Sequence, residues 1–192
     1  SVSSVTVAEN LASGYAVFNV SLSKASPVTT TVDFAAVPGT ATSADFNVAG
    51  MQVSTDGGTT WTTATSAIFA ANQTANVSVR VPIVNDTLDE ATETFSLLAT
   101  TRAGAGYTLN PSARGTGTIT DNDPTPTLTV NDLTVDEAAG SATFTVSLST
   151  ASGLTVTVGY NTSNGTATGG SDYTAATGTL NFQAILHDPE LL

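Results

Sequence analysis

The 192-residue sequence predicts an all-β protein with the architecture of an antiparallel β-sandwich, and three observations predict it. Thr, Val, Ser, Ala and Gly dominate the composition, and Thr and Val favour pleated, half-buried strands. Apolar and polar residues alternate in short runs that turn residues separate, a pattern typical of strands with one buried face. No segment shows a convincing helical period. Many short strands with alternating faces favour a sandwich.

The predicted strands follow from this alternation in chain order. A first strand covers 5–9, and a second carries an apolar stripe from Ala16 to Leu22. A Gly-Thr-Ala-Thr turn at 39–42 precedes Asp45. Three further strands are predicted at 77–84, 94–101 and 115–120.

An internal repeat sets the domain organisation. Residues 5–9 match 133–137, residues 18–26 match 144–152, and the turn at 39–42 matches 165–168. We therefore predict a complete repeat over 1–123 and a partial repeat over 124–192. The Pro124-Thr125-Pro126 stretch predicts a short, stiff linker, because each proline fixes φ and restricts its predecessor.

The second repeat lacks counterparts of the strands at 77–84, 94–101 and 115–120. Half a sandwich exposes an apolar face and open strand edges. We expect a partner chain to complete it, as in a strand-exchanged homodimer; the alternative is a simply truncated repeat. Because the sequence starts at Ser1 without Met, we expect a fragment of a larger protein.

The charge balance excludes some partners. Four Lys and Arg against sixteen Asp and Glu give a formal charge of −12. Nucleic acids and anionic membrane surfaces are poor partners, because both attract Lys and Arg. No apolar run approaches the roughly 20 residues of a membrane span, and the absence of Cys excludes disulfides.

Acidic residues gather where the predicted strands of the first repeat end. In a sandwich, the exits of the strands at 77–84 and 115–120 share one end, so Asp86 and Glu90 would neighbour Asp121 and Asp123. Clustered carboxylates repel one another unless a cation lies among them. Calcium prefers such oxygen ligands, and the absence of His and Cys here disfavours zinc or copper. For each acid alone, turn formation is an alternative explanation.

Four stretches of the first repeat resemble the Calx-beta family: residues 5–9, 39–46, 81–95 and 117–124. The resemblance implies a seven-stranded, immunoglobulin-like sandwich with calcium at one tip. Carried over position by position, the implied metal ligands are Glu9, Asp45, Asp86, Glu90, Asp121 and Asp123. Asn85 and Asn122 stand where the exchanger domains of the family have acids, which predicts fewer or weaker ions. In the second repeat only Glu137 and Asp172 match ligand positions.

One insertion stands out in the first repeat. Residues 54–61 follow the Asp-box pattern, Ser-x-Asp-x-Gly-x-Thr-Trp, and predict a hairpin near 51–64. Asp56 would bond turn amides, Gly57 and Gly58 would supply positive φ, and Trp61 would cover the hairpin.

These features predict a non-enzymatic protein, because no nucleophile, base and cleft occur together and His187 is the only histidine. We expect a calcium-binding structural or adhesion repeat of a larger bacterial secreted or cell-surface protein. Its partners would be calcium ions and neighbouring repeats. The alternative is a carbohydrate-binding or accessory module of a secreted hydrolase, with an aromatic platform around Trp61, Tyr15 or Tyr107. A cytosolic calcium sensor is disfavoured by Asn85 and Asn122.

Overall fold

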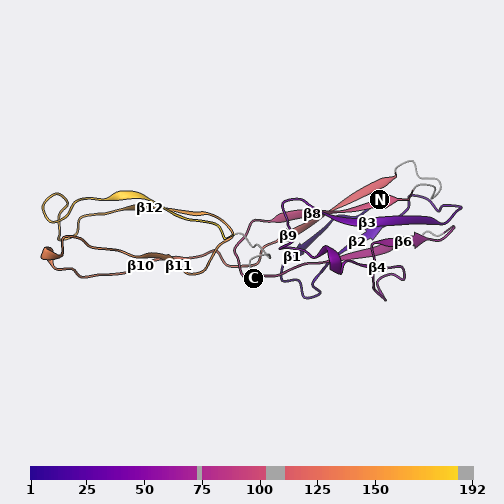
Figure 1. The fold of residues 1–192 in the computed structure, drawn as a ribbon, viewed down its shortest axis with the longest axis horizontal. Helices are drawn as coiled ribbons and strands as arrows, with labels where there is room; N and C mark the ends of the chain where they lie inside the picture. Colours follow the sequence, from indigo (N-terminus) through magenta and orange to yellow (C-terminus); the bar gives the residue numbers. More distant parts are fainter. Residues whose placement is uncertain (73–74, 103–110, 186–192) are drawn as a thin grey trace. The chain divides into compact units, whose positions relative to one another are not determined.

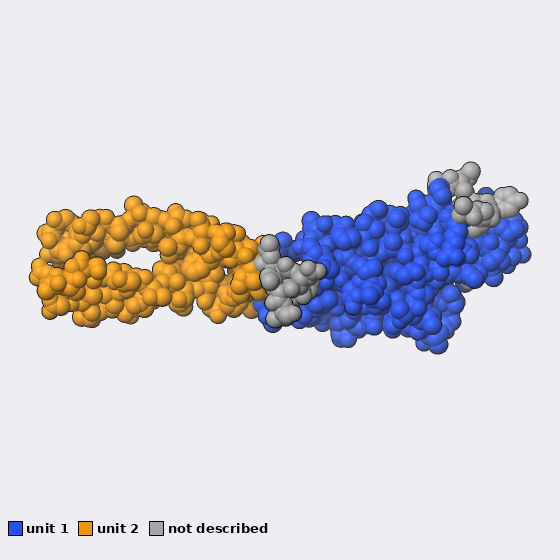
Figure 2. Space-filling model, viewed as in Figure 1, with its two compact units in different colours: residues 1–87, 91–122, 188–192 blue, residues 88–90, 123–187 orange. Residues whose placement is uncertain are grey.

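A computed structural model describes residues 1–72, 75–102 and 111–185. Its strands form two compact units (Figures 1 and 2). We call residues 1–87 and 91–122 the first unit, and residues 88–90 together with those from Asp123 onward the second unit. No helix in the described part of the chain is long and apolar enough to cross a membrane.

Two sheets face each other in the first unit, as the sequence predicts for a sandwich. The five-stranded sheet has the order β1 (Val5–Ala8), β9 (Ser112–Thr120), β8 (Glu93–Thr101), β3 (Thr30–Pro38), β6 (Ser66–Phe69). The four-stranded sheet has the order β2 (Tyr15–Val20), β7 (Val77–Pro82), β4 (Gln52–Ser54), β5 (Thr62–Thr63), with the short η1 (Val48–Gly50) before β4. All named pairs are antiparallel except β1 with β9, which run parallel with Ala8 opposite Thr120.

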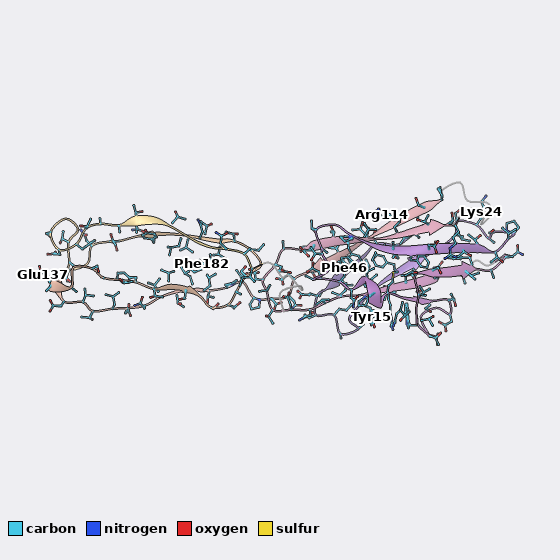
Figure 3. The ribbon with its side chains drawn as sticks, viewed as in Figure 1. Tyr15, Lys24, Phe46, Arg114, Glu137 and Phe182 are labelled. Atoms are coloured by element: carbon cyan, nitrogen blue, oxygen red, sulfur yellow. The ribbon has the colours of Figure 1, made fainter. Side chains whose placement is uncertain are left out.

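The alternation seen in the sequence becomes the core of this unit. Val77, Val79 and Val81 of β7 are fully buried. Phe46 lies between the sheets (Figure 3) and stacks on Phe95 with ring centroids 4.6 Å apart. Gly117 of β9 lies beneath this ring, and a Cβ there would come within 2.5 Å of the Phe95 side chain. Every buried hydrophobic residue in the described part of the chain belongs to the first unit.

Two separate ladders make up the second unit. One joins β10 (Leu128–Val130) to β11 (Val146–Leu148), and the other joins β12 (Val156–Asn161) to β13 (Thr177–Phe182); the short η2 (Glu137–Ala139) lies between β10 and β11 in the chain. Open space is visible between the two layers (Figure 2). Phe144 is 56 % exposed and Tyr160 44 %, so the described residues of this unit form the framework of a sandwich without a filled core.

The pairing register of the strands is the same in the two sequence repeats. With the spacing of 126 residues that relates Phe18 to Phe144, Thr30 corresponds to Val156. Thr30 pairs with Phe69 in the first unit, and Val156 pairs with Phe182 in the second. The β12–β13 ladder is therefore the counterpart of the β3–β6 ladder.

The counterpart of β1 behaves differently. Residues 133–137 match residues 5–9 in sequence, yet the structure gives them no strand, only the start of η2 at Glu137. In the first unit β1 is a strand because it pairs with β9. A strand needs a neighbour for its backbone groups, and the described part of the second unit offers no counterpart of β9.

Candidate metal centre

Strand topology brings acidic residues to one end of the first unit. β1, β7 and β9 end there, and β8 begins there, since Ala8 is opposite Thr120 and Glu93 is opposite Ile119. The Glu9 amide continues this pattern by donating to the Thr120 carbonyl oxygen at 3.0 Å. We call this end the acidic tip; within the first unit it carries Glu9, Asp45, Asp86, Glu93 and Asp121.

Glu9 and Asp86 form the first carboxylate pair of the tip. Each offers an oxygen, and the two oxygens lie within 4.8 Å of each other. Glu9 is only 8 % exposed, and its Oε1 accepts a hydrogen bond from the Asp86 amide at 2.5 Å. A nearly buried carboxylate beside a second one is costly unless positive charge compensates it.

Asp45 and Glu93 form the second pair, with carboxylate oxygens also within 4.8 Å. The backbone holds Asp45 near the end of β7, because the Val84 amide donates to the Asp45 carbonyl oxygen at 2.9 Å. Asp45 Oδ2 accepts from the Thr42 amide at 2.6 Å and from the Thr42 hydroxyl at 3.0 Å. The turn predicted at 39–42 thus orients this carboxylate.

The other predicted ligands are placed differently. Asp121 follows β9 at the acidic tip but belongs to neither pair. Its neighbour Asn122 accepts a hydrogen bond from the Asn10 amide at 2.8 Å, which ties the exits of β1 and β9 together. Glu90 and Asp123 belong to the second unit, so their role as ligands stays a prediction.

Glu93 is a member of the acidic tip that the sequence prediction of ligands did not include. The signal for it was the start of the predicted strand at 94–101, which runs antiparallel to the last strand of the repeat. A residue that opens such a strand lies beside the exit of its partner.

The donor set fits a hard cation. The acidic tip offers carboxylate oxygens, and the first unit contains neither His nor Cys. Oxygen-only donor sets are typical of calcium, whereas zinc and copper sites use nitrogen and sulfur. The residues present therefore fit the ion that the family resemblance implies.

Comparison with known protein families decides the classification. The family model of the Calx-beta domain matches the chain twice, over residues 1–125 and 120–187. The chain belongs to the Calx-beta family. The sequence resemblance is thereby confirmed, and both units contain a Calx-beta match.

Solved structures with a similar fold include Calx-beta domains. The chain is 19 % identical to the calcium binding domain CBD12 of CALX1.1, covering 96 % of this chain and 71 % of that one with a TM-score of 0.46. It is 19 % identical to the apo-form Calx CBD1 domain, covering 62 % of this chain and 89 % of that one with a TM-score of 0.43. No curated protein matches the chain.

In its described residues, the second Calx-beta repeat keeps the local turn but has no acidic tip of its own. Asp172 Oδ2 accepts from the Thr168 amide at 2.7 Å, as Asp45 Oδ2 does from the Thr42 amide. Glu137 lies at the start of η2, whose N-cap is Asp136. The turn thus forms without a ligand cluster, which shows that turn chemistry alone accounts for part of the Asp45 geometry.

The Asp-box segment of the first repeat forms the β4–β5 hairpin. Asp56 Oδ1 accepts from the amides of Thr59 and Thr60 at 3.1 and 2.9 Å, and Gly57 and Gly58 have φ of 74° and 90°. Hydrogen bonds from Thr60, first from its hydroxyl and then from its amide, with a further one from Ser54, lower the pKa of Asp56 to about 2. This carboxylate therefore holds a turn together.

Two of the aromatic residues predicted as a sugar-binding platform, Tyr15 and Trp61, contact a cation. The Arg80 guanidinium lies 4.1 Å from the Tyr15 ring centroid and 4.3 Å from that of Trp61. Gln52 Oε1 accepts from the same guanidinium. One face of each ring is thus used for cation–π contact rather than for stacking on a sugar. Tyr107 lies outside the described residues.

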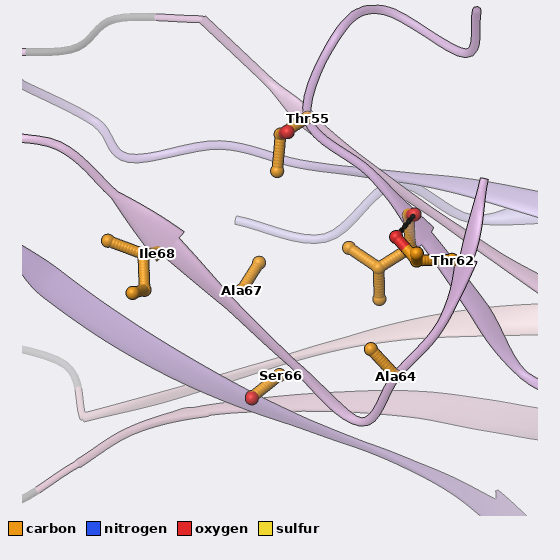
Figure 4. Close-up of a pocket in the computed structure, with 7 residues that line it drawn as sticks. Thr55, Thr62, Ala64, Ser66, Ala67 and Ile68 are labelled. Atoms are coloured by element: carbon orange, nitrogen blue, oxygen red, sulfur yellow. Dashed lines mark hydrogen bonds between the residues drawn. The ribbon is translucent and has the colours of Figure 1, made fainter. Parts of the chain in front are cut away.

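A groove of about 510 Å³ opens between β4, β5 and β6 (Figure 4). Its lining consists of Val53, Thr55, Thr62, Ala64, Ser66, Ala67 and Ile68. None of these side chains is a carboxylate, a histidine or a lysine, so the groove holds no acid–base pair for catalysis.

Proposed function

We propose that the chain is a calcium-binding structural module whose first repeat holds the ion at the acidic tip. The observation that carries this proposal is the pairing of Glu9 with Asp86 and of Asp45 with Glu93 by strands far apart in sequence. Calcium would neutralise these carboxylates. It would also link the C-terminal ends of β1 and β7 to the N-terminal end of β8. The ion would then stiffen the end of the sandwich.

The composition of the tip also bears on affinity. Calcium sites rich in carboxylates bind tightly, and sites with fewer carboxylates bind more weakly. Asn85 and Asn122 supply amides where acids are expected, so we propose a dissociation constant on the order of 10⁻⁴–10⁻³ M, as in extracellular modules. We propose a place in a bacterial secreted or cell-surface protein, with a role in spacing or adhesion, which the tandem Calx-beta repeats support. Neighbouring repeats would be its partners, and its role would be non-enzymatic.

Calorimetry tests the calcium proposal. Titration of the full chain with CaCl₂ should give saturable binding, and the melting temperature of the first unit should rise with calcium. Asp86→Asn should abolish both effects. Asp33→Asn is the matched control, because it makes the same chemical change on β3, where Asp33 forms an ion pair with Arg102. This variant should bind calcium as the parent chain does. Equal calcium responses in the two variants would refute the assignment.

A strand-exchanged homodimer through the second repeat stays a prediction. Light scattering tests it: a mass of two chains would support exchange, and a monomer mass would contradict it.

A further inference from the structure

The N-terminal segment of the first unit joins both of its sheets. Residues 1–3 run beside β2 of the four-stranded sheet, where the Ser3 amide donates to the Asn19 carbonyl oxygen at 2.9 Å. The segment then crosses to the five-stranded sheet and continues as β1. Gly115 of β9 makes room for the crossing, because a Cβ at this position would collide with the Ser3 carbonyl oxygen. A single stretch of chain therefore ties the two layers of the sandwich together.

Hydrogen bonds join β1 to β9 beyond the four residue pairs of their ladder. Before β1, the Ser4 hydroxyl accepts a hydrogen bond from the Thr116 amide at 3.1 Å. After β1, the Glu9 amide donates to the Thr120 carbonyl oxygen at 3.0 Å. The Thr120 hydroxyl also donates to the Val7 carbonyl oxygen at 3.2 Å. Polar contacts therefore hold the two strands together along the whole length of β1.

The same ladder is anchored in the core of the first unit. Val7 of β1 lies opposite Ile119 of β9. Both side chains belong to the hydrophobic core, and their exposed fractions are 8 % and 5 %. To slide along β9, β1 would have to break its hydrogen bonds and draw Val7 past its core neighbours. Because close-packed side chains interdigitate, such a movement has a high energy barrier.

The parallel direction of β1 and β9 determines how a pulling force acts on their ladder. The chain enters β1 at Val5 and leaves β9 at Thr120, and these residues lie at opposite ends of the ladder. Tension along the chain therefore pulls the two strands in opposite directions along their own length. The evenly spaced hydrogen bonds of a parallel pair then share the tension and have to break together.

We propose that the β1–β9 ladder is a mechanical clamp, which keeps the first repeat folded when tension acts along the chain. The ladder joins the first and last strands of the repeat, so it has to break before tension reaches the strands between them. Forced unfolding is governed by the unfolding rate, and the clamp lowers this rate under tension. This function goes beyond the proposed calcium binding and does not depend on it, since backbone groups and two hydroxyls form the clamp.

The direction of pulling tests the proposal directly, and the absence of Cys from the chain allows handles to be attached at chosen positions. In a shear form of the full chain, Ser1→Cys and Thr125→Cys carry DNA handles, so that the force slides β1 along β9. In a peeling form, Ser1→Cys and Ser112→Cys carry them. Ser112 begins β9, so this force separates the ladder from its Val5 end, one pair after another. Optical tweezers in EDTA should give a rupture force several times larger for the shear form, and equal forces would overturn the proposal.

A matched pair of threonine variants assigns the resistance to the ladder. Thr120→Val removes the hydroxyl that donates to the Val7 carbonyl oxygen. It should lower the rupture force of the shear form only, because Thr120 belongs to the last pair that separates when β1 is peeled away. Thr118→Val changes a hydroxyl of the same strand that has no hydrogen-bond partner among the described residues, and it should leave both forces unchanged.

Two results with these variants would overturn the proposal: an unchanged shear force in Thr120→Val, or an equal loss in the shear and peeling forms. EDTA removes calcium from every measurement, so a failure of the calcium proposal and a failure of this one are distinguishable.

Discussion

The two Calx-beta repeats of this chain share sequence motifs and ladder register, yet among the described residues only the first has a buried hydrophobic core. β3 of the first unit lies between β6 and β8, whereas β12 of the second unit pairs only with β13 among the described residues. This difference shows that the local sequence is sufficient to form a β-ladder with the same strand register in both repeats. Burial of its apolar face depends on strands that come later in the chain, because a single ladder cannot bury its side chains.

The loss of unfolding free energy on removal of an aromatic side chain should show the largest difference between the two units. Phe95→Ala removes a fully buried ring and should cost about 3–5 kcal/mol of unfolding free energy. Phe182→Ala, in the half-buried β13, should cost about 1 kcal/mol or less. Urea denaturation followed by Trp61 fluorescence for the first unit, and by amide exchange for the second, measures both. Similar losses would contradict the description of the second unit as lacking a filled core.

Calcium should stabilise only the first repeat. At a free concentration of 100 times the dissociation constant it should stabilise the first unit by about 2.7 kcal/mol, and the exchange protection of β12 and β13 should not change. Hydrogen exchange with and without CaCl₂ measures both units in one sample. Equal stabilisation of β12–β13 would contradict an ion confined to the acidic tip.

The hairpin insertion is a smaller difference between the repeats. Arg80→Ala removes the cation between Tyr15 and Trp61 and should destabilise the first unit by about 1–2 kcal/mol. Arg114→Ala is the control, since this exposed arginine of β9 should contribute less than about 0.5 kcal/mol. A chemical denaturation curve for each variant suffices, and indistinguishable midpoints would show that the stacking contributes nothing.

The smallest expected effect is a pH response within this hairpin. Because hydrogen bonds lower the folded-state pKa of Asp56 to about 2, its contribution to stability is complete above its unfolded pKa, which is near 4. That contribution is lost as the pH falls through about 2. An NMR titration of the Asp56 carboxyl carbon measures it directly, and a midpoint near 4 would contradict the hydrogen-bonded turn. Asp56→Asn should remove the pH response.

Local sequence predicted much of the first unit. The stripes of Val77, Val79 and Val81 and of Phe95, Leu97 and Ala99 identified both strands and their buried faces, because side chains alternate with a period of two along any strand. The turn at 39–42 and the Asp-box hairpin could also be predicted from the sequence, since both depend on hydrogen bonds between residues a few positions apart.

The sequence by itself determined the β class, the repeat and the acids at strand ends. Only the tertiary structure decided which of those acids meet. Glu9 lies beside Asp86, 77 residues away in the sequence. Glu93 rather than Asp121 lies beside Asp45. Strand order and the parallel pairing of β1 with β9 set these distances between segments that are far apart in the chain. Electrostatic interaction depends on these distances through space, and no local pattern along the chain encodes them.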